Sequence, residues 1–512
     1  MTTFSSLAVL ALGLAAASPA LAQTSAGDDE TIVDAGADAG ATARWHLQRI
    51  ARLDDVRPML NAVIAINPDA PAEALAAEQA GLPLMGRTVL VKDNIETREL
   101  PTTAGSLALA GNNTGRDAPL IANLREAGGV VLGKTNLSEW ANIRDFNSTS
   151  GWSAVGGLTR NPHAIDRNTC GSSSGSGAAV AAGFAWAAIG TETNGSITCP
   201  ASINGIVGFK PTVGLVSRTH VVPISSTQDT AGPMARSVKA AAMLLTAIAG
   251  SDPEDSATKE ADTHKRNFTD GLATASLEGV RIGVMRKQVG DRADVAELFD
   301  AALADLEAAG AVLVDIEFEP SEEMDRDSFT VLLFELREEM GKYLRSIPPV
   351  TGREQMTPRS LADLIAFNER HADAELRWFG QGIFELAEQT TDRPAYEAAR
   401  ENAIHLAGER GIDMLLAENN VQFLVAPTMG PAWTSDLVNG DNYNGSIGFG
   451  SPAAIAGYPH LTVPMGAVED LPIGLSIIGA KWQDWEVLKA GAAYERARTA
   501  TLPTPDFKRW ME

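Results

Sequence analysis

The sequence predicts an α/β fold in which helices cover a β-sheet. In both halves of the chain, short apolar runs typical of buried strands alternate with segments of helical apolar spacing. This alternation favours a sheet with helices packed against it. The composition, with 45% apolar and 21% charged residues, is that of a protein with a packed core. At 512 residues the chain is long enough for two domains, although one large α/β domain can also reach this size.

The first half of the chain supplies strands and helices in close succession. The predicted strands cover residues 86–91 and 130–132, and the predicted helices cover residues 38–65, 118–127 and 178–189. The first of these strands ends at Lys92. The last of these helices consists almost entirely of small or apolar residues, so we expect it deep in the core, close to other backbone.

The second half repeats the alternation around a helical interruption. The predicted strands cover residues 280–284, 312–318, 424–427, 461–464 and 473–478. Asp294 and Glu297 have the spacing of a capping box, which predicts the start of a helix that ends at Gly310. Residues 321–420 have a mainly helical pattern, and we expect an insertion there that could wall a substrate entrance. The charged residues 251–270 are predicted to form an exposed connector.

The N-terminus resembles a cleaved secretory signal. Residues 1–22 contain no charged side chain, and an apolar run over residues 7–17 is followed by Ala20-Leu21-Ala22, an ending typical of a cleavage site. The run is too short to span a bilayer, and no later segment has the pattern of a membrane span. We therefore expect a periplasmic or secreted protein with no membrane partner. The alternative is an ordinary frayed N-terminus.

Charge and cysteine content narrow the classes of partner. The formal net charge of −24 gives an acidic surface that repels phosphate backbones, so nucleic-acid substrates are disfavoured. The two cysteines, Cys170 and Cys199, each lie within three positions of a serine discussed below. We expect two small, buried, apolar thiols that line the active-site region. The alternative is a disulfide, which requires Cα atoms within about 7 Å of each other.

Ser196 and Lys92 are the first candidates for chemistry. Ser196 ends a turn of small residues, 193–196, whose backbone N–H groups could converge on one oxygen. Amide hydrolysis needs such donors together with a nucleophile and a proton shuttle. Lys92 follows an apolar run, and burial would lower its pKa enough to make it a base. Taken alone, Ser196 is also explained by a tight surface turn, and Lys92 by a strand end with its ammonium in water.

A glycine- and serine-rich loop over residues 170–177 has rival interpretations. Its segment 171–175 matches the Gly-x-Ser-x-Gly nucleophile elbow, which would make Ser173 the nucleophile and His460 its partner. That elbow should follow a buried strand, but a polar loop precedes it here. The loop also lacks the Gly-Lys-Ser/Thr ending of a phosphate-binding loop. No pair of histidines or cysteines has the spacing of a metal site.

Several motifs together resemble the amidase signature family, and more narrowly its bacterial peptide amidases. Cys-Gly-Ser-Ser-Ser-Gly-Ser (170–176) resembles the family's Gly-Gly-Ser-Ser-Gly-Gly-Ser, and Glu-Thr-Asn-Gly-Ser-Ile (192–197) resembles its Asp-x-Gly-Gly-Ser-Ile. Val-Lys-Asp-Asn-Ile (91–95) resembles the segment that carries the family's base. Further matching segments are residues 134–140, 208–212, 457–459 and 471–475. The resemblance covers essentially the whole mature chain.

The resemblance implies a fold in which a large, mixed, twisted β-sheet is covered by helices on both faces. We expect residues 1–22 to be the signal and residues 23–512 to form a single catalytic domain. Within that domain, the signature core covers residues 85–240, where the resemblance is most specific. The helical insertion is expected at about residues 321–420.

The resemblance also implies the roles of individual residues. The family's Ser-cisSer-Lys triad corresponds to Ser196 as nucleophile, Ser172 as proton relay and Lys92 as base, with a cis peptide bond between Gly171 and Ser172. Its oxyanion hole corresponds to the backbone N–H groups of Thr193, Asn194, Gly195 and Ser196. Neither a metal nor an organic cofactor is expected.

The implied activity is hydrolysis of a carboxamide C–N bond through an acyl-enzyme. We expect the substrate to be a small-molecule or peptide amide, most directly the C-terminal amide of a peptide with release of ammonia, and the protein to be a monomer or homodimer. Small acyl or aryl amides are the alternative substrates on the same triad. Cys170 and Asn194 replace family glycines, and with residues 198–200 they are closer to the peptide-amidase branch than to the tRNA-linked glutamine amidotransferases. The alternatives from other classes are an α/β-hydrolase-type esterase and a non-catalytic exported binding protein.

Overall fold

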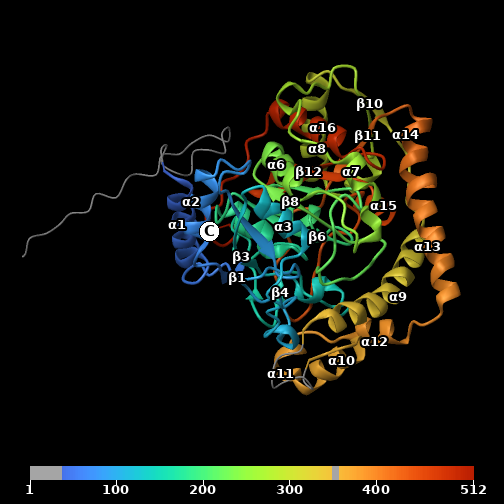
Figure 1. The fold of residues 1–512 in the computed structure, drawn as a ribbon. Helices are drawn as coiled ribbons and strands as arrows, with labels where there is room; N and C mark the ends of the chain where they lie inside the picture. Colours follow the sequence, from blue (N-terminus) through green and yellow to red (C-terminus); the bar gives the residue numbers. More distant parts are fainter. Residues whose placement is uncertain (1–36, 349–356, 512) are drawn as a thin grey trace, which may run out of the picture.

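The computed structural model describes residues 37–348 and 357–511, which form an α/β fold around one large sheet (Figure 1). The predicted signal, residues 1–22, lies outside the described residues. In the described chain the large sheet has eleven strands, in the order β1-β3-β2-β6-β8-β7-β12-β13-β11-β9-β10. Their bounds are β1 Val63–Ile66, β2 Thr88–Lys92, β3 Val130–Thr135, β6 Ala187–Glu192, β7 Val207–Lys210, β8 Thr230–Ala235, β9 Arg281–Val284, β10 Val312–Asp315, β11 Phe423–Pro427, β12 His460–Val468 and β13 Leu471–Ile478. A separate short ribbon pairs β4 (Trp152–Ser153) with β5 (Gly157–Leu158).

The sheet is mixed, as the resemblance implies. β2 pairs in parallel with β3 on one side and with β6 on the other. β9 likewise pairs in parallel with β10 and β11. The other pairs of the sheet are antiparallel. Because parallel neighbours need long crossovers, helices separate β2, β3 and β6 along the chain.

Helices cover both faces of the sheet, because successive side chains of a strand point to opposite sides. On β2, Val89 and Val91 belong to one hydrophobic core, and Leu90 between them belongs to another. The first core contains residues of α3 (Pro119–Glu126), α6 (Val238–Ile248), α8 (Ala293–Ala308) and α16 (Asp484–Ala497). The second contains residues of α1 (Ala39–Leu53), α2 (Ala70–Gln79) and α4 (Ser174–Ala181). The predicted α/β fold class is therefore confirmed.

The predicted insertion is helical. Its helices are α9 (Glu322–Ser346), α10 (Leu361–Arg370), α11 (Ala372–Glu375), α12 (Gly382–Gln389), α13 (Arg393–Ala407) and α14 (Met414–Glu418). Figure 1 shows α9 and α13 along one side of the molecule, in yellow and orange. Phe384 of α12 meets Trp140 of the signature core edge to face, with ring centroids 5.9 Å apart. This contact belongs to a hydrophobic cluster that also includes Leu336 and Met340 of α9, so the helices are packed onto the core.

Two predicted helices are shorter than expected. Helix α1 ends at Leu53, and Pro58 follows before β1, so residues 38–65 are not one helix. Helix α4 ends at Ala181, and Ala187–Glu192 is a central strand instead of the end of a helix. Gly183 separates the two with a φ of +70°, a left-handed conformation that a continuing helix cannot contain.

Two smaller expectations also need correction. Helix α8 begins at Ala293, one residue before Asp294, and its N-cap Arg292 makes no side-chain capping bond, so the capping box is absent. Asp294 instead binds Arg292 and its own neighbour Val295 N. The segment 251–270 includes α7 (Ala261–His264) and buries Phe268, so it is only partly an exposed connector.

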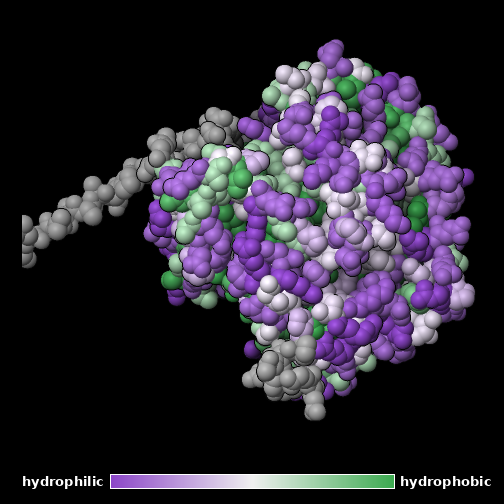
Figure 2. All heavy atoms as spheres, viewed as in Figure 1, coloured by the Kyte–Doolittle hydropathy of each residue, from purple (hydrophilic) through white to green (hydrophobic). Residues whose placement is uncertain are grey.

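The face of the described chain that Figure 2 shows is mainly polar. Figure 2 shows hydrophilic residues over most of the visible face, with smaller apolar patches between them. None of the helices in the described part of the chain combines the length and the apolar character that a bilayer crossing requires.

Candidate active site

Two neighbouring parallel strands bring the candidate residues to one edge of the sheet. Lys92 is the last residue of β2, β6 ends at Glu192, and the turn 193–196 follows directly. Parallel neighbours have their carboxyl ends at the same edge of a sheet, which is where ligands bind in many open α/β folds. The pairing of Val91 with Ile189 sets the register, so that the Lys92 side chain reaches Thr191 near the end of β6.

Lys92 is fully buried and makes three polar contacts. Its Nζ donates to Thr191 O over 3.1 Å and to Thr191 Oγ1 over 2.9 Å, and it lies 2.8 Å from Ser172 Oγ. Burial lowers the pKa of Lys92 from 10.5 to about 7, although the negative charges of Asp229 and Glu192 oppose this shift. A neutral amine has two N–H groups and one lone pair. With both N–H groups on Thr191, the lone pair faces the Ser172 hydroxyl.

Ser172 lies in the loop that precedes α4. The Gly171-Ser172 peptide bond is cis, as predicted, and the Ser172 side chain is buried. Two backbone hydrogen bonds hold the loop in place: Ser138 N donates to Ser172 O, and Ser173 N donates to Ser196 O, each over 3.1 Å. The second bond joins the loop to the residue predicted to be the nucleophile. The structure thus places Lys92 and Ser172 in direct side-chain contact and attaches Ser196 to the same loop through its backbone.

The turn 193–196 presents unused donors. In the described chain, the backbone N–H groups of Thr193, Asn194, Gly195 and Ser196 make no hydrogen bond within the protein. Gly195 has a φ of +80°, the left-handed conformation that such turns require. Carboxylates fix the turn at both ends: Asp229 Oδ1 accepts from Thr193 Oγ1 over 2.6 Å, and Glu192 Oε2 accepts from Ile197 N over 2.8 Å. The free N–H groups form a concave donor site suited to a developing oxyanion.

The turn opens into a cavity of about 830 Å³, whereas Lys92 and Ser172 lie behind its wall. Thr193, Asn194, Gly195 and Ser196 all line this cavity. Further wall residues come from helix α9, from the loop before α15 (Gly450–Ala456), and from His460 at the start of β12. Phe146 and Tyr443 line its open side and are 65% and 53% exposed. The cavity therefore extends from the partly exposed turn of Ser196 to a rim that includes the exposed aromatic side chains.

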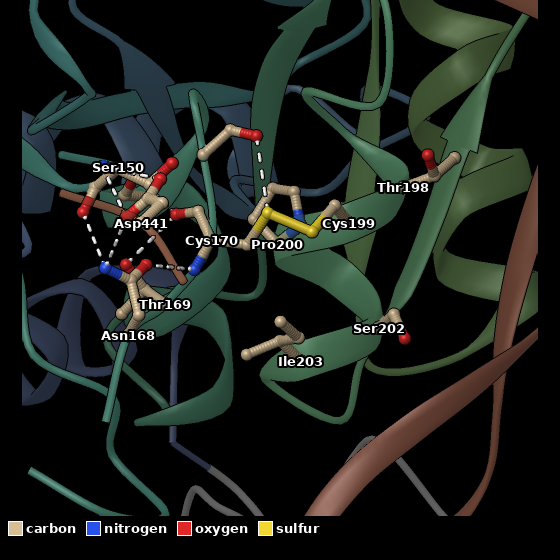
Figure 3. Close-up of a disulfide and its surroundings, with 12 residues drawn as sticks. Ser150, Asn168, Thr169, Cys170, Thr198, Cys199, Pro200, Ser202, Ile203 and Asp441 are labelled. Carbon is tan, nitrogen blue, oxygen red and sulfur yellow. Dashed lines mark hydrogen bonds between the residues drawn. A yellow bond between two sulfur atoms is a disulfide. The ribbon is translucent and has the colours of Figure 1, made fainter. Parts of the chain in front are cut away.

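The two cysteines form a disulfide, so the expectation of free thiols is wrong. Figure 3 shows the bond between Cys170, just before the cis peptide bond, and Cys199 in α5 (Thr198–Ile203). Their Cα atoms are 6.0 Å apart, because both the loop and α5 must approach the same site. Asn168 supports this loop: its Oδ1 accepts from Cys170 N over 2.7 Å, and its Nδ2 donates to Ser150 O over 3.0 Å. The bond covalently joins the loop of Ser172 to the helix that follows Ser196.

The sequence profile of the amidase family matches residues 47–488. The chain belongs to the amidase signature family. It is therefore a hydrolase that acts on amides. A probable amidase from Arabidopsis thaliana is 37% identical over 482 residues, which cover 90% of this chain and 87% of the relative. A glutamyl-tRNA(Gln) amidotransferase component from Halobacterium salinarum is 34% identical over 430 residues, covering 81% and 96% of the two chains.

A solved structure is also closely similar. The native peptide amidase from Stenotrophomonas maltophilia superposes with a TM-score of 0.85 at 46% identity, covering 92% of this amidase and 96% of that chain. The shared fold agrees with the mixed sheet described above.

The esterase alternative requires Ser173 and His460 to form a hydrogen-bonded pair, but in this amidase each side chain has another partner. Ser173 Oγ donates to Thr191 O over 3.1 Å, and His460 Nε2 lies 2.7 Å from Ser476 Oγ. Within the described chain no hydrogen bond joins the two side chains, so the elbow interpretation has no geometric support.

Sequence reasoning missed two residues of the amidase site, Thr191 and Asp229. Thr191 receives both N–H groups of Lys92 and binds Ser173, but the predicted helix over residues 178–189 concealed the strand that carries it. Asp229 accepts a hydrogen bond from Thr193 in the turn 193–196 and lies outside every matched motif. Its only signal in the sequence is its charge, because the neighbouring residues on both sides are uncharged.

Proposed function

We propose that the amidase hydrolyses its substrate through an acyl-enzyme on Ser196, with Ser172 as relay and Lys92 as base. The observation that carries this proposal is the 2.8 Å contact between Lys92 Nζ and Ser172 Oγ, with both N–H groups of the amine engaged elsewhere. A base in this position withdraws a proton from Ser172 without moving any side chain.

The proton path follows from that contact. As Ser196 Oγ bonds to the carbonyl carbon, its proton passes to Ser172 Oγ, and the Ser172 proton passes to neutral Lys92. The carbonyl electron pair moves onto oxygen, where the free N–H groups of residues 193–196 stabilise it. When the C=O bond reforms, the C–N bond breaks, and the proton returns through Ser172 to the leaving nitrogen. Water then repeats the sequence on the ester, which releases the acid and restores Ser196.

The proposed substrate is a peptide with a C-terminal carboxamide, whose nitrogen is released as ammonia. The 46% identity to a peptide amidase supports this choice. The cavity has the volume of a site that encloses a small molecule or a chain end, and its aromatic rim can hold the residues behind that end. Among the described wall residues, Asp145, Asp325 and Asp441 carry charge and no lysine or arginine does. A neutral amide end suits this wall better than a free carboxylate.

A substrate panel tests the choice. Peptide amides, free amino-acid amides and aliphatic amides are compared by ammonia release, and the peptide amides are expected to have the highest kcat/KM. Turnover of small aliphatic amides alone would contradict the peptide assignment and leave the small-amide alternative.

The nucleophile is tested separately. Mass spectrometry after labelling with a serine-directed phosphonate is expected to find the label on Ser196, and Ser196→Ala is expected to prevent both labelling and turnover. Label on Ser173, with loss of activity in His460→Ala, would instead support the esterase alternative.

The proposal includes export to the periplasm or the medium. The Cys170–Cys199 disulfide supports it, because such bonds persist mainly in oxidising compartments. N-terminal sequencing of the protein recovered from its native fraction is expected to begin at residue 23. A cytosolic protein that still carries residues 1–22 would contradict the proposal.

A further inference from the structure

Gln228 is a buried amide that the proposed mechanism does not use. It lies in the loop 224–229 before β8, is 1% exposed, and is not among the described residues that line the cavity. Its Nε2 donates to Thr193 O over 3.3 Å, and its Oε1 accepts from Ser328 Oγ of α9 over 2.9 Å. The side chain therefore connects the helical insertion to the turn 193–196, which carries the proposed oxyanion donors.

The two partners of Gln228 settle which way its amide faces. Thr193 O is a carbonyl oxygen and can only accept, so the NH2 group of the amide must face it. The amide oxygen then faces Ser328, whose hydroxyl donates to it. A reversed amide would place two acceptor oxygens against each other and deprive the Thr193 carbonyl of this donor.

The bond to Thr193 O fixes the peptide group that joins Thr193 to Asn194. This peptide bond is trans, so its C=O and N–H bonds point in opposite directions. The carbonyl points behind the wall, toward Gln228, and the Asn194 N–H therefore points to the other side, where both residues line the cavity. A reversed peptide group would turn a carbonyl oxygen toward the developing oxyanion and remove one of its donors.

The second contact of Thr193 does not fix this peptide group. Asp229 Oδ1 accepts from Thr193 Oγ1, which holds the side chain of the threonine. Rotation about the Cα–C bond of Thr193 leaves that side-chain contact in place, yet this rotation decides which way the carbonyl points. The carbonyl therefore needs a donor of its own, and Gln228 Nε2 is the donor that the structure places there.

Helix α9 supports the loop of Gln228 at two points. Ser328 binds Gln228, and Glu335 accepts from Thr227 N over 3.0 Å and from Thr227 Oγ1 over 2.6 Å. Ser328 and Glu335 are seven residues apart, about two helical turns, so both lie on one face of the helix. The helix that contributes to the cavity wall thus also supports the loop behind the turn 193–196.

We propose that Gln228 is a positioning residue that keeps the Asn194 N–H directed at the oxyanion, and that Ser328 of α9 acts through it. This inference rests on the proposed function. Ser328 holds the Gln228 amide in one orientation, and the amide in turn holds the peptide group. Neither side chain is among the described cavity-lining residues, so their loss should weaken binding of the transition state far more than binding of the substrate.

Substitutions at both residues test these contacts by steady-state kinetics on a peptide amide. Gln228→Met keeps the length of the side chain and removes its polar atoms. It is expected to lower kcat about tenfold, less than the roughly 100-fold or larger effect of losing an oxyanion donor entirely, and to change KM less than about twofold. Gln381→Met, the same change at a buried glutamine of the insertion that binds Asn368 outside the cavity lining, is the matched control and should keep the wild-type kcat.

The contribution of Ser328 is tested by rescue and by a double variant. Ser328→Ala is expected to lower kcat by a smaller factor than Gln228→Met, and Ser328→Thr, which keeps the hydroxyl, to restore it. In the Gln228→Met background Ser328→Ala should cause no further loss, because the two residues act in series. Equal losses with and without Gln228 would overturn the inference. Ser328→Ala also serves as the test if Gln228→Met does not fold, and an unchanged kcat would then contradict the proposal.

A peptide aldehyde measures the oxyanion site itself. The Ser196 hydroxyl adds to the aldehyde and forms a tetrahedral hemiacetal, whose oxygen needs the same donors as the oxyanion. Gln228→Met is expected to weaken aldehyde inhibition about tenfold, in parallel with kcat/KM, and to leave inhibition by the corresponding peptide acid unchanged. Equal weakening by both inhibitors would show general damage to the cavity and overturn the inference. Failure of the proposed function is recognised separately, because Ser196→Ala would then retain turnover.

Discussion

The pH dependence of turnover tests the role of Lys92 most directly. Only the neutral amine accepts a proton, and burial lowers the Lys92 pKa from 10.5 to about 7. At that pKa about half of the molecules carry a neutral amine at pH 7, about 1% at pH 5 and about 90% at pH 8. We therefore expect kcat/KM to fall roughly 50-fold from pH 7 to pH 5 and to rise less than about twofold above pH 7.

The charge of Asp229 acts on the pKa of Lys92, so replacing Asp229 by a neutral residue gives a second test. Asp229 is the larger of the two negative charges that oppose the lowering of the Lys92 pKa. Asp229→Asn removes this charge, so the Lys92 pKa should fall further and the acid limb of the profile should move to lower pH. Asp229 also accepts a hydrogen bond from Thr193 Oγ1, so thermal unfolding of the variant is measured alongside its activity.

The assay measures ammonia release from one amide substrate between pH 5 and pH 10 at constant ionic strength. A rate that rises tenfold per pH unit beyond pH 8, as for an ordinary lysine base, would refute the reasoning. A flat profile between pH 5 and pH 9, or an acid limb that moves to higher pH in Asp229→Asn, would refute it as well.

Three further predictions concern stability and the oxyanion turn. Lys92→Met should abolish turnover and remove the contribution of Lys92 to the rise of stability between pH 7 and 10.5, leaving the smaller rise from Lys210, whose pKa burial lowers to about 8. Between these pH values Lys92 is protonated in the unfolded wild type and neutral in the folded protein, so the free energy of unfolding rises with pH, by up to about 5 kcal/mol. Urea unfolding at pH 7 and at pH 10 measures this rise. Cys170→Ala combined with Cys199→Ala should lower the free energy of unfolding by about 3–4 kcal/mol for a loop of separation 29, and unchanged urea unfolding would contradict the bond. Gly195→Ala should lower the free energy of unfolding by about 1–2 kcal/mol, because the φ of +80° at this position strains alanine. It should also reduce kcat more than it changes KM, which steady-state kinetics measure.

The sequence predicts an element best where only one structure fits its pattern. Residues 88–92 are all buried, and an apolar run of this length that ends in lysine fits a strand between two cores. Residues 178–189 fit two structures, because small apolar residues are equally suited to a buried helix and to a buried strand. The backbone of Gly183 decides between them, and nothing in the local pattern predicts its conformation.

The candidate site divides in the same way. Lys92, Ser172 and Ser196 could be named because each lies in a segment that resembles a family motif. The contact of Lys92 with Thr191 could not, since it depends on the register between β2 and β6. Pairing of the cysteines was equally inaccessible, because it depends on a 6.0 Å approach between two elements that only the folded chain brings together.

The origin of the cavity walls has a consequence for how such enzymes diversify. The hydroxyls and the amine of the proposed triad belong to residues 85–240, whereas Met324, Asp325 and Leu332 of α9 and the loop 439–450 form other parts of the cavity wall. Substitutions in this helix and this loop can therefore change which acyl chain the cavity accepts during evolution, while the residues of the proposed triad stay the same.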